Sequence, residues 1–93
     1  MSKLSQNNFK NFDDYKSMFK KQLDEISDEE LINAYLEHPT NASGFVVQIY
    51  RNIMSESFKK RFGTTVLNNK ENGHETFSFG KSIKLINGKI KKI

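Results

Sequence analysis

The sequence has no cysteine and no tryptophan, and its only proline is Pro39. Without cysteine, the chain can form neither a disulfide framework nor a thiolate metal site. It also lacks a run of about 18 apolar residues, the length of a membrane span, and its first ten residues lack the apolar core of a signal peptide. We therefore predict a cytoplasmic protein that has no membrane segment and does not bind membranes.

Catalytic and cofactor-binding patterns are also missing. His38 and His74 lie at a helix end and after a turn, so we expect both at the surface, and no further ligand completes a zinc set. There is no glycine-rich phosphate loop of the Walker or dinucleotide-binding type. The serines lie at caps, in a helix or on a polar strand face, and none is placed beside a base. We predict a protein that is not an enzyme and that uses no cofactor or metal.

What the sequence does have is a basic C-terminal half. The 93 residues, 35% of them hydrophobic, suffice for one small domain, and the net charge is +4. Residues 1–37 hold five lysines against eight acids, whereas residues 38–93 hold ten lysines or arginines against three glutamates. Such an asymmetry steers anionic partners toward one end of the molecule.

Three helices are predicted from apolar residues that recur three and four positions apart. Asn11 can cap the first helix, and Ser27 with Glu30 forms a capping box for the second, which Pro39 ends. Thr40, Asn41 and Ser43 are candidate caps for the third. The predicted helices are 11–25, 28–37 and 42–62, preceded by a segment, residues 1–8, that we expect to be flexible.

The third helix is the centre of the predicted fold, because no other stretch has so much apolar surface at one period. Its apolar arc contains Val46, Val47, Ile49, Tyr50, Ile53, Met54 and Phe58. Its polar arc contains Gln48, Arg51, Asn52, Ser55 and Lys59. A helix that is apolar over half its circumference packs against more than one partner, so we expect the rest of the chain to cover it.

After Gly63 the apolar period changes from 3.6 to 2, which indicates strands. The predicted strands are 64–70, 75–86 and 89–93, joined by tight turns at Asn72-Gly73 and Asn87-Gly88. The predicted pairs are Val66 with Phe79, Lys70 with Glu75, and Leu85 with Ile90. Gly80 can mark a bulge or bend. The fold class is therefore α+β: three helices followed by a three-stranded antiparallel meander packed on the long third helix.

The last predicted hairpin is basic. Its two-residue turn places Lys84 opposite Lys91, with Lys89 on the same outward face and Lys81 and Lys92 nearby in sequence. Like charges directly opposite each other destabilise a sheet, so an anionic partner above them would be favourable. The alternative interpretation is that lysines on a short edge strand prevent edge-to-edge aggregation.

The element order, three helices and then a β-hairpin, is similar to that of winged-helix DNA-binding proteins. In those proteins the third helix enters the major groove and the wing contacts phosphate. Residues on the polar arc of the third helix, from Gln48 to Lys59, are of types that read bases. The alternatives are that this arc is only solvated or that it binds a protein.

Two functions from different classes remain. The first is a small non-enzymatic protein that binds stoichiometrically to an acidic or nucleic-acid-binding protein surface or to a nucleoprotein complex, with Ile86, Met18 or Tyr15 as apolar anchors. Its composition resembles that of accessory proteins of phages and mobile elements, which implies an inhibitor of a host defence system of the anti-CRISPR kind. The second is a winged-helix-like regulator, a candidate homodimer, that binds DNA through the third helix and the basic hairpin.

Overall fold

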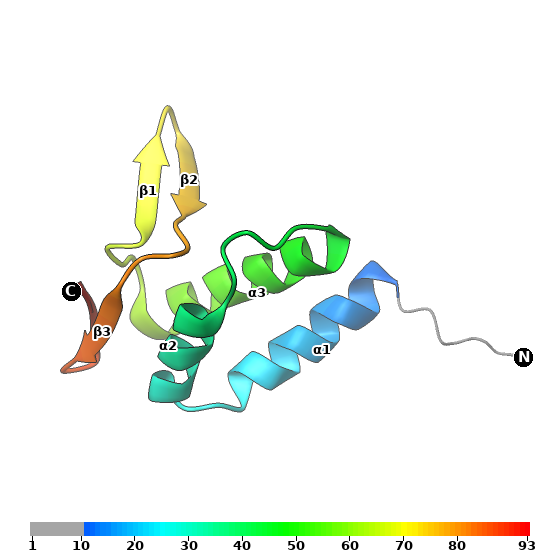
Figure 1. The fold of residues 1–93 in the computed structure, drawn as a ribbon, viewed down its shortest axis with the longest axis horizontal. Coiled ribbons are helices and arrows are strands. Elements are labelled where there is room, and N and C mark those ends of the chain that lie inside the picture. Colours follow the sequence, from blue (N-terminus) through cyan, green and yellow to red (C-terminus); the bar gives the residue numbers. More distant parts are fainter. Residues whose placement is uncertain (1–10) are drawn as a thin grey trace, which may run out of the picture.

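The computed structural model describes residues 11–93, so the expected flexibility of residues 1–8 lies outside the described residues. The chain is α+β, as predicted, with three helices followed by two antiparallel hairpins (Figure 1). The elements are α1 (Phe12–Asp24), α2 (Asp28–Glu37), α3 (Phe45–Phe62), β1 (Asn68–Glu71), β2 (His74–Phe77), β3 (Ile83–Ile86) and β4 (Lys89–Lys92). No helix in the described chain has the length and hydrophobicity to cross a membrane.

The local signals at the helix ends have mixed outcomes. Asn11 caps α1 and Ser27 caps α2, each in a reciprocal capping box with the acid three residues later, as predicted for Ser27. The predicted side-chain cap of the third helix is wrong, because α3 begins at Phe45 and its N-cap is Gly44, with φ +119°. That left-handed backbone suits glycine and prevents the helix from starting at residue 42.

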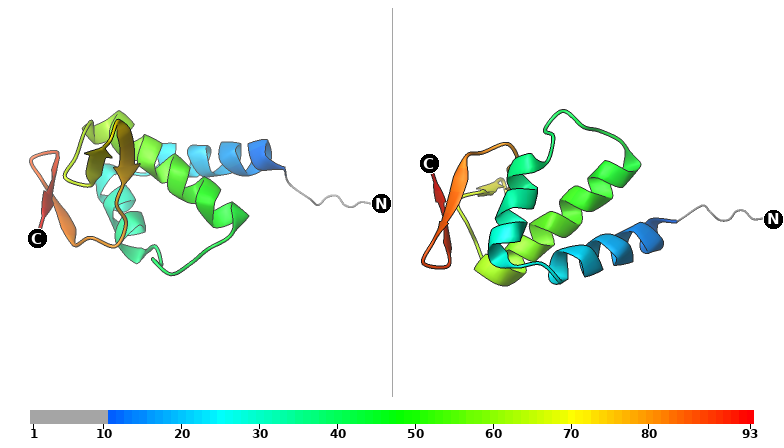
Figure 2. Two further views of the ribbon diagram at one scale, coloured as in Figure 1. Left: turned by 90° about the horizontal axis from the view of Figure 1, so that it is seen from above. Right: turned by 60° about the horizontal axis from the view of Figure 1, so that its bottom comes forward.

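Helices α1 and α3 lie side by side and run in the same direction, and α2 lies across the C-terminal end of the pair (Figure 2). Aromatic rings mark the parallel contact: Phe12 lies 6.1 Å from Phe45, and Phe19 lies 5.1 Å from Tyr50, between ring centroids. A parallel pair needs a connection that returns the chain to its starting end. The short α2 and the loop after it make that connection.

The predicted strand 75–86 is wrong as a single element, because residues 78–82 do not form a strand. The predicted bend at Gly80 is confirmed: its φ of +81° lies in the left-handed region that favours glycine. A Cβ at this position would lie 2.7 Å from the Thr40 methyl carbon. The strand therefore divides into β2 and β3, and two separate two-stranded sheets replace the expected meander.

Tyr35 on α2 provides the second reason for the break. Its hydroxyl donates to the carbonyl of Ser78 at 2.6 Å and accepts the amide of Lys81 at 3.2 Å. Backbone groups that a continuous strand would pair within a sheet are thus satisfied by a buried side chain. Burial raises the pKa of Tyr35, which keeps the hydroxyl in the protonated form that donates this bond.

Within each hairpin the predicted register is confirmed where strands exist. Lys70 pairs with Glu75, and Leu85 pairs with Ile90. Both Asn-Gly turns have positive φ at their two central residues, the geometry of the tight turn expected there. Val66 and Phe79 are not strand partners, because β1 begins only at Asn68.

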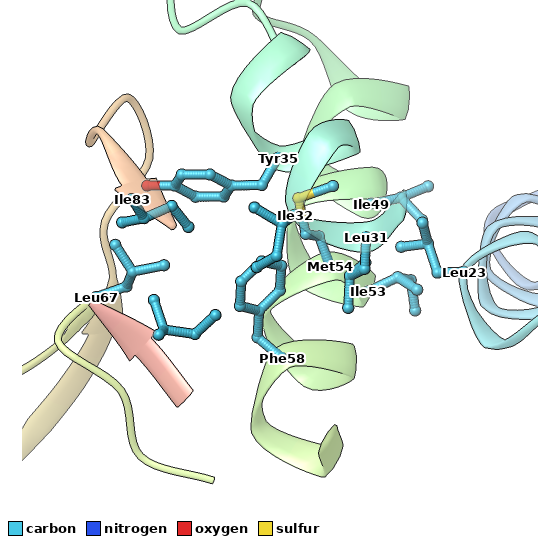
Figure 3. Close-up of a cluster of buried hydrophobic side chains, with 11 residues drawn as sticks. Leu23, Leu31, Ile32, Tyr35, Ile49, Ile53, Met54, Phe58, Leu67 and Ile83 are labelled. Atoms are coloured by element: carbon cyan, nitrogen blue, oxygen red, sulfur yellow. The ribbon is translucent and has the colours of Figure 1, made fainter. Parts of the chain in front are cut away.

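The core joins the helices to the β3–β4 hairpin. Tyr35 and Phe58 lie between the helical side chains on one side and Leu67 and Ile83 on the other (Figure 3). The backbone of β3 approaches α2 rather than α3, which corrects the expectation of a sheet packed on the third helix. Val46, predicted on the apolar arc of that helix, is 37% exposed at its N-terminal end.

Candidate binding surface

The β3–β4 hairpin presents an outward face that carries both cationic and apolar side chains. Lys84 lies opposite Lys91, and Ile86 lies opposite Lys89. Two residues further from the turn along each strand, the amide of Ile93 donates a hydrogen bond to the carbonyl of Ser82 at 3.0 Å. Ile86 is 38% exposed and Ile93 is 78% exposed. We call the set Lys84, Ile86, Lys89, Lys91 and Ile93 the basic hairpin face.

No lysine of the basic hairpin face forms an ion pair with a carboxylate of residues 11–93. The four ion pairs found in residues 11–93 involve Lys20, Lys59, Lys60 and Arg61. Opposed like charges weaken a cross-strand pair, and no ion pair within the described chain offsets the repulsion here. The face thus combines uncompensated positive charge with exposed isoleucines.

Lys81 and Lys92 flank this face without belonging to it. Lys81 precedes β3, and its backbone is fixed by the bond from its amide to the Tyr35 hydroxyl. Lys92 pairs with the buried Ile83, so alternation along β4 puts it on the opposite face of the hairpin from Lys91. Both side chains are exposed.

Replacing Lys84 with glutamate is expected to stabilise the protein. The substitution converts an opposed like-charge pair into an opposed Glu–Lys pair, worth about 0.2–1 kcal/mol in a cross-strand position. Urea unfolding at low salt would show a higher free energy of unfolding for Lys84→Glu than for the wild type. Lys84→Glu/Lys91→Glu restores a like-charge pair and should lose the gain, and a double variant as stable as the single one would contradict this account.

The predicted site residues on α3 do not form one surface with the hairpin. In Figure 1 the β3–β4 hairpin lies beyond the C-terminal end of α3, whereas Gln48 and Asn52 belong to its N-terminal half. Gln48 and Asn52 are exposed and joined by a 3.1 Å hydrogen bond. Ser55 is half-buried, and Lys59 is paired with Glu75 of β2. Within this arc, only Gln48 and Asn52 have side chains that are exposed and that do not bond to another helix, strand or loop.

Arg51 is occupied by the loop between α2 and α3. One guanidinium nitrogen donates to the carbonyls of Pro39, Thr40 and Ala42 at 3.1–3.2 Å. The guanidinium also lies 5.4 Å from the ring centroid of Phe79. An arginine that satisfies three loop carbonyls loses them if it turns outward to a base or phosphate. Its position therefore indicates that it fixes the loop.

His38 is the remaining partner of Arg51, and it is half-buried rather than at the surface as expected; His74 is exposed. The Nε2 atom of His38 accepts from Arg51 Nε at 2.9 Å, so the neutral ring carries its proton on Nδ1. Burial, and then the positive charge of Arg51, lower the pKa of His38 below its ordinary value. No local sequence pattern predicts this pair, because the partners lie 13 residues apart across a loop.

Acidification is expected to weaken the fold through His38. Its pKa is lower in the folded protein than in the unfolded chain, so its contribution is present above the unfolded pKa and is lost as the pH falls through the folded pKa. The free energy of unfolding should decrease as the pH falls below 6.5, the ordinary pKa of histidine, and should keep decreasing until the pH passes the lowered pKa of the folded protein. The decrease should be smaller in His38→Asn than in the wild type. Equal pH dependence in the two proteins would contradict the assignment.

A groove of about 240 Å³ lies between α2 and β3 and was not predicted from the sequence. Its apolar lining is Ile32, Leu36, Ile83 and Leu85, and its polar lining is Glu29, Asn33 and Lys84. Leu36 is 47% exposed. The sequence could not indicate the groove because it depends on β3 packing against α2 instead of α3.

Residues 11–93 contain no group of three or more histidines and acids placed to hold a metal ion. No family model matches this sequence, and no curated protein or solved structure is significantly similar to it.

Proposed function

We propose that the protein is a small non-enzymatic binding protein that docks stoichiometrically, through the basic hairpin face, on an acidic surface of another protein. The observation that supports it best is the combination on one face of uncompensated lysines with the exposed Ile86 and Ile93. In protein interfaces a few apolar anchors supply most of the affinity, while charge sets the encounter rate. Inhibition of a host defence complex by such docking belongs to this proposal.

The exposed isoleucines favour a protein over DNA. Lysines alone are enough to bind a phosphate backbone, and isoleucine adds no hydrogen bond to that interaction. The engagement of Arg51 and Lys59 within the fold also leaves the third helix with few groups for reading bases. Direct binding to DNA by a winged-helix-like mode is therefore the second candidate, which the same experiment tests.

The test is fluorescence anisotropy with two labelled probes, a random glutamate–leucine copolymer and a sequence-randomised DNA duplex, at about 50 and 200 mM salt. We expect the copolymer to bind and Lys84→Glu/Lys91→Glu to weaken that binding roughly tenfold. The matched control is Lys16→Glu/Lys21→Glu, which makes the same charge change on exposed positions of α1. Ile86→Ser should weaken binding to the copolymer and leave the duplex unaffected.

Two results would overturn the proposal. If both double variants lower copolymer binding equally, net charge explains the affinity and the basic hairpin face is not the site. If the duplex binds more tightly than the copolymer, with a steep salt dependence that the hairpin variant abolishes, the DNA-binding alternative replaces it.

A further inference from the structure

The edge of β3 that faces away from β4 has backbone groups available for another strand. The bond from the Ile93 amide to the Ser82 carbonyl identifies that pair as a hydrogen-bonded one. Hydrogen-bonded and non-hydrogen-bonded pairs alternate along antiparallel strands, so Lys84 and Lys91 form the next hydrogen-bonded pair. Leu85 belongs to a non-hydrogen-bonded pair, so its N–H and C=O point away from β4. Outside the hairpin, no group in residues 11–93 forms a hydrogen bond to the backbone of Leu85.

The groove between α2 and β3 lies alongside this edge. A strand added at β3 would direct alternate side chains to opposite faces of the enlarged sheet. Side chains on the inner face would enter the groove over Leu36 and Leu85, and those on the outer face would lie beside Lys84. The edge, the groove and the lysines therefore match one kind of ligand, an extended segment in which apolar and acidic residues alternate.

We propose that an extended acidic segment of a partner protein adds as a third strand to the edge of β3. This inference rests on the proposed function and specifies the partner that the basic hairpin face would bind. The acids belong on the outer face, because Glu29 lines the groove on the inner side, whereas Lys84 and Lys91 form no ion pair within residues 11–93. A third strand also completes a sheet, since a two-stranded hairpin is by itself only marginally stable.

The decisive probe is a labelled peptide of alternating glutamate and valine in two N-methylated forms. One form is methylated on every glutamate amide and the other on every valine amide. Successive amides of a strand point to opposite edges, so each form blocks one edge of the peptide and leaves the other able to pair. We expect one form to keep the affinity of the unmethylated peptide and the other to lose at least roughly tenfold.

Nuclear magnetic resonance on the intact protein identifies the edge. Binding of the unmethylated peptide should slow hydrogen exchange of the Leu85 amide, which faces the incoming strand. Leu36→Glu should weaken binding, because it places a charge in the groove beside the added strand. The matched control is Val46→Glu, the same kind of change at an exposed site in the first turn of α3.

The outcomes separate this inference from the proposed function. Equal affinity of both methylated peptides, or an unchanged exchange rate at Leu85 with bound peptide, overturns strand addition. The proposed function still stands in that case if the glutamate–leucine copolymer binds through Lys84 and Lys91. No binding of the unmethylated peptide overturns strand addition too, and loss of copolymer binding as well overturns both.

Discussion

Replacing Phe58 with alanine is expected to lower the free energy of unfolding by about 3–5 kcal/mol, the cost of truncating a fully buried aromatic side chain. Phe58 has no exposed surface, and its ring centroid lies 5.5 Å from Tyr35 and 5.2 Å from Phe77. A protein of this length has a total stability of roughly 5–14 kcal/mol, so the change removes a large part of it. The midpoint of thermal unfolding should fall by roughly 15–30 °C.

The effect should reach the binding surface as well as the core. The Phe58 ring lies where the helices meet Leu67 and Ile83, the residues that seat the β3–β4 hairpin (Figure 3). A cavity at this place releases the hairpin from α2 before it disturbs the contact between α1 and α3. We therefore expect amides of β3 to exchange faster than those of α1 in Phe58→Ala.

Phe58→Leu is the control, because it keeps most of the buried volume and should cost less than half as much. Both variants should be compared with the wild type by urea unfolding followed by circular dichroism. A loss of under about 1 kcal/mol in Phe58→Ala would show that the ring is not the junction between helices and hairpin.

The sequence predicts well those features that depend on neighbours along the chain. The Ser27 capping box, the stop at Pro39 and the two Asn-Gly turns each need only a few adjacent residues, and the structure contains all of them. The pairing of Lys84 with Lys91 follows from the same turn, since a two-residue loop sets the register of a hairpin.

Features that depend on distant residues were not predictable. The division of the expected strand 75–86 requires the hydroxyl of Tyr35, which lies 43 residues from Ser78 in the sequence. Alternation of Phe77, Phe79 and Ile83 continues through Gly80, so the apolar pattern alone favours one strand. The groove beside β3 was missed for the same reason, because it exists only where that division places the hairpin against α2.

The polar arc of the third helix shows how a pattern can conceal a structural role. Periodicity places Arg51 with Gln48 and Asn52, yet its side chain turns to the loop carbonyls while the other two remain exposed. The sequence contains only two arginines, Arg51 and Arg61, and both bind loops from α3. Every other cation is lysine, whose single ammonium group lacks the planar fork that bonds several oxygens at once.

Replacing Arg61 with alanine is expected to cost about 2–3 kcal/mol of stability. One guanidinium nitrogen donates to the carbonyls of Leu23 and Ile26 at 2.6 and 2.7 Å, and another contacts Asp28 at 3.0 Å. Both carbonyls are partly buried. That of Leu23 lies in the last turn of α1, where a helix supplies no donors, and that of Ile26 lies in the link to α2, so losing these bonds costs more than losing the contact with the exposed Asp28. Urea unfolding measures the difference from the wild type.

Two variants distinguish this role from simple charge removal. Lys60→Ala deletes the adjacent cation, which is mostly exposed and lies 3.9 Å from Asp24, so it should cost under about 0.5 kcal/mol. Arg61→Lys keeps the charge but should recover less than half of the loss, because one ammonium group cannot reach both carbonyls and Asp28. Full recovery in Arg61→Lys would show that charge alone matters at this position.

Arg61 should also influence binding at a distance, because the two arginines hold α2 at its two ends. Arg61 hydrogen-bonds Asp28 and the Ile26 carbonyl at the start of α2. Arg51 hydrogen-bonds His38 and the carbonyls of the loop at the end of α2. The groove for the added strand is formed by α2 against β3, so a freed α2 changes its width without altering any residue that lines it. We expect Arg61→Ala, under conditions where it stays folded, to weaken binding of the glutamate–valine peptide more than Lys60→Ala does, although both variants remove one positive charge.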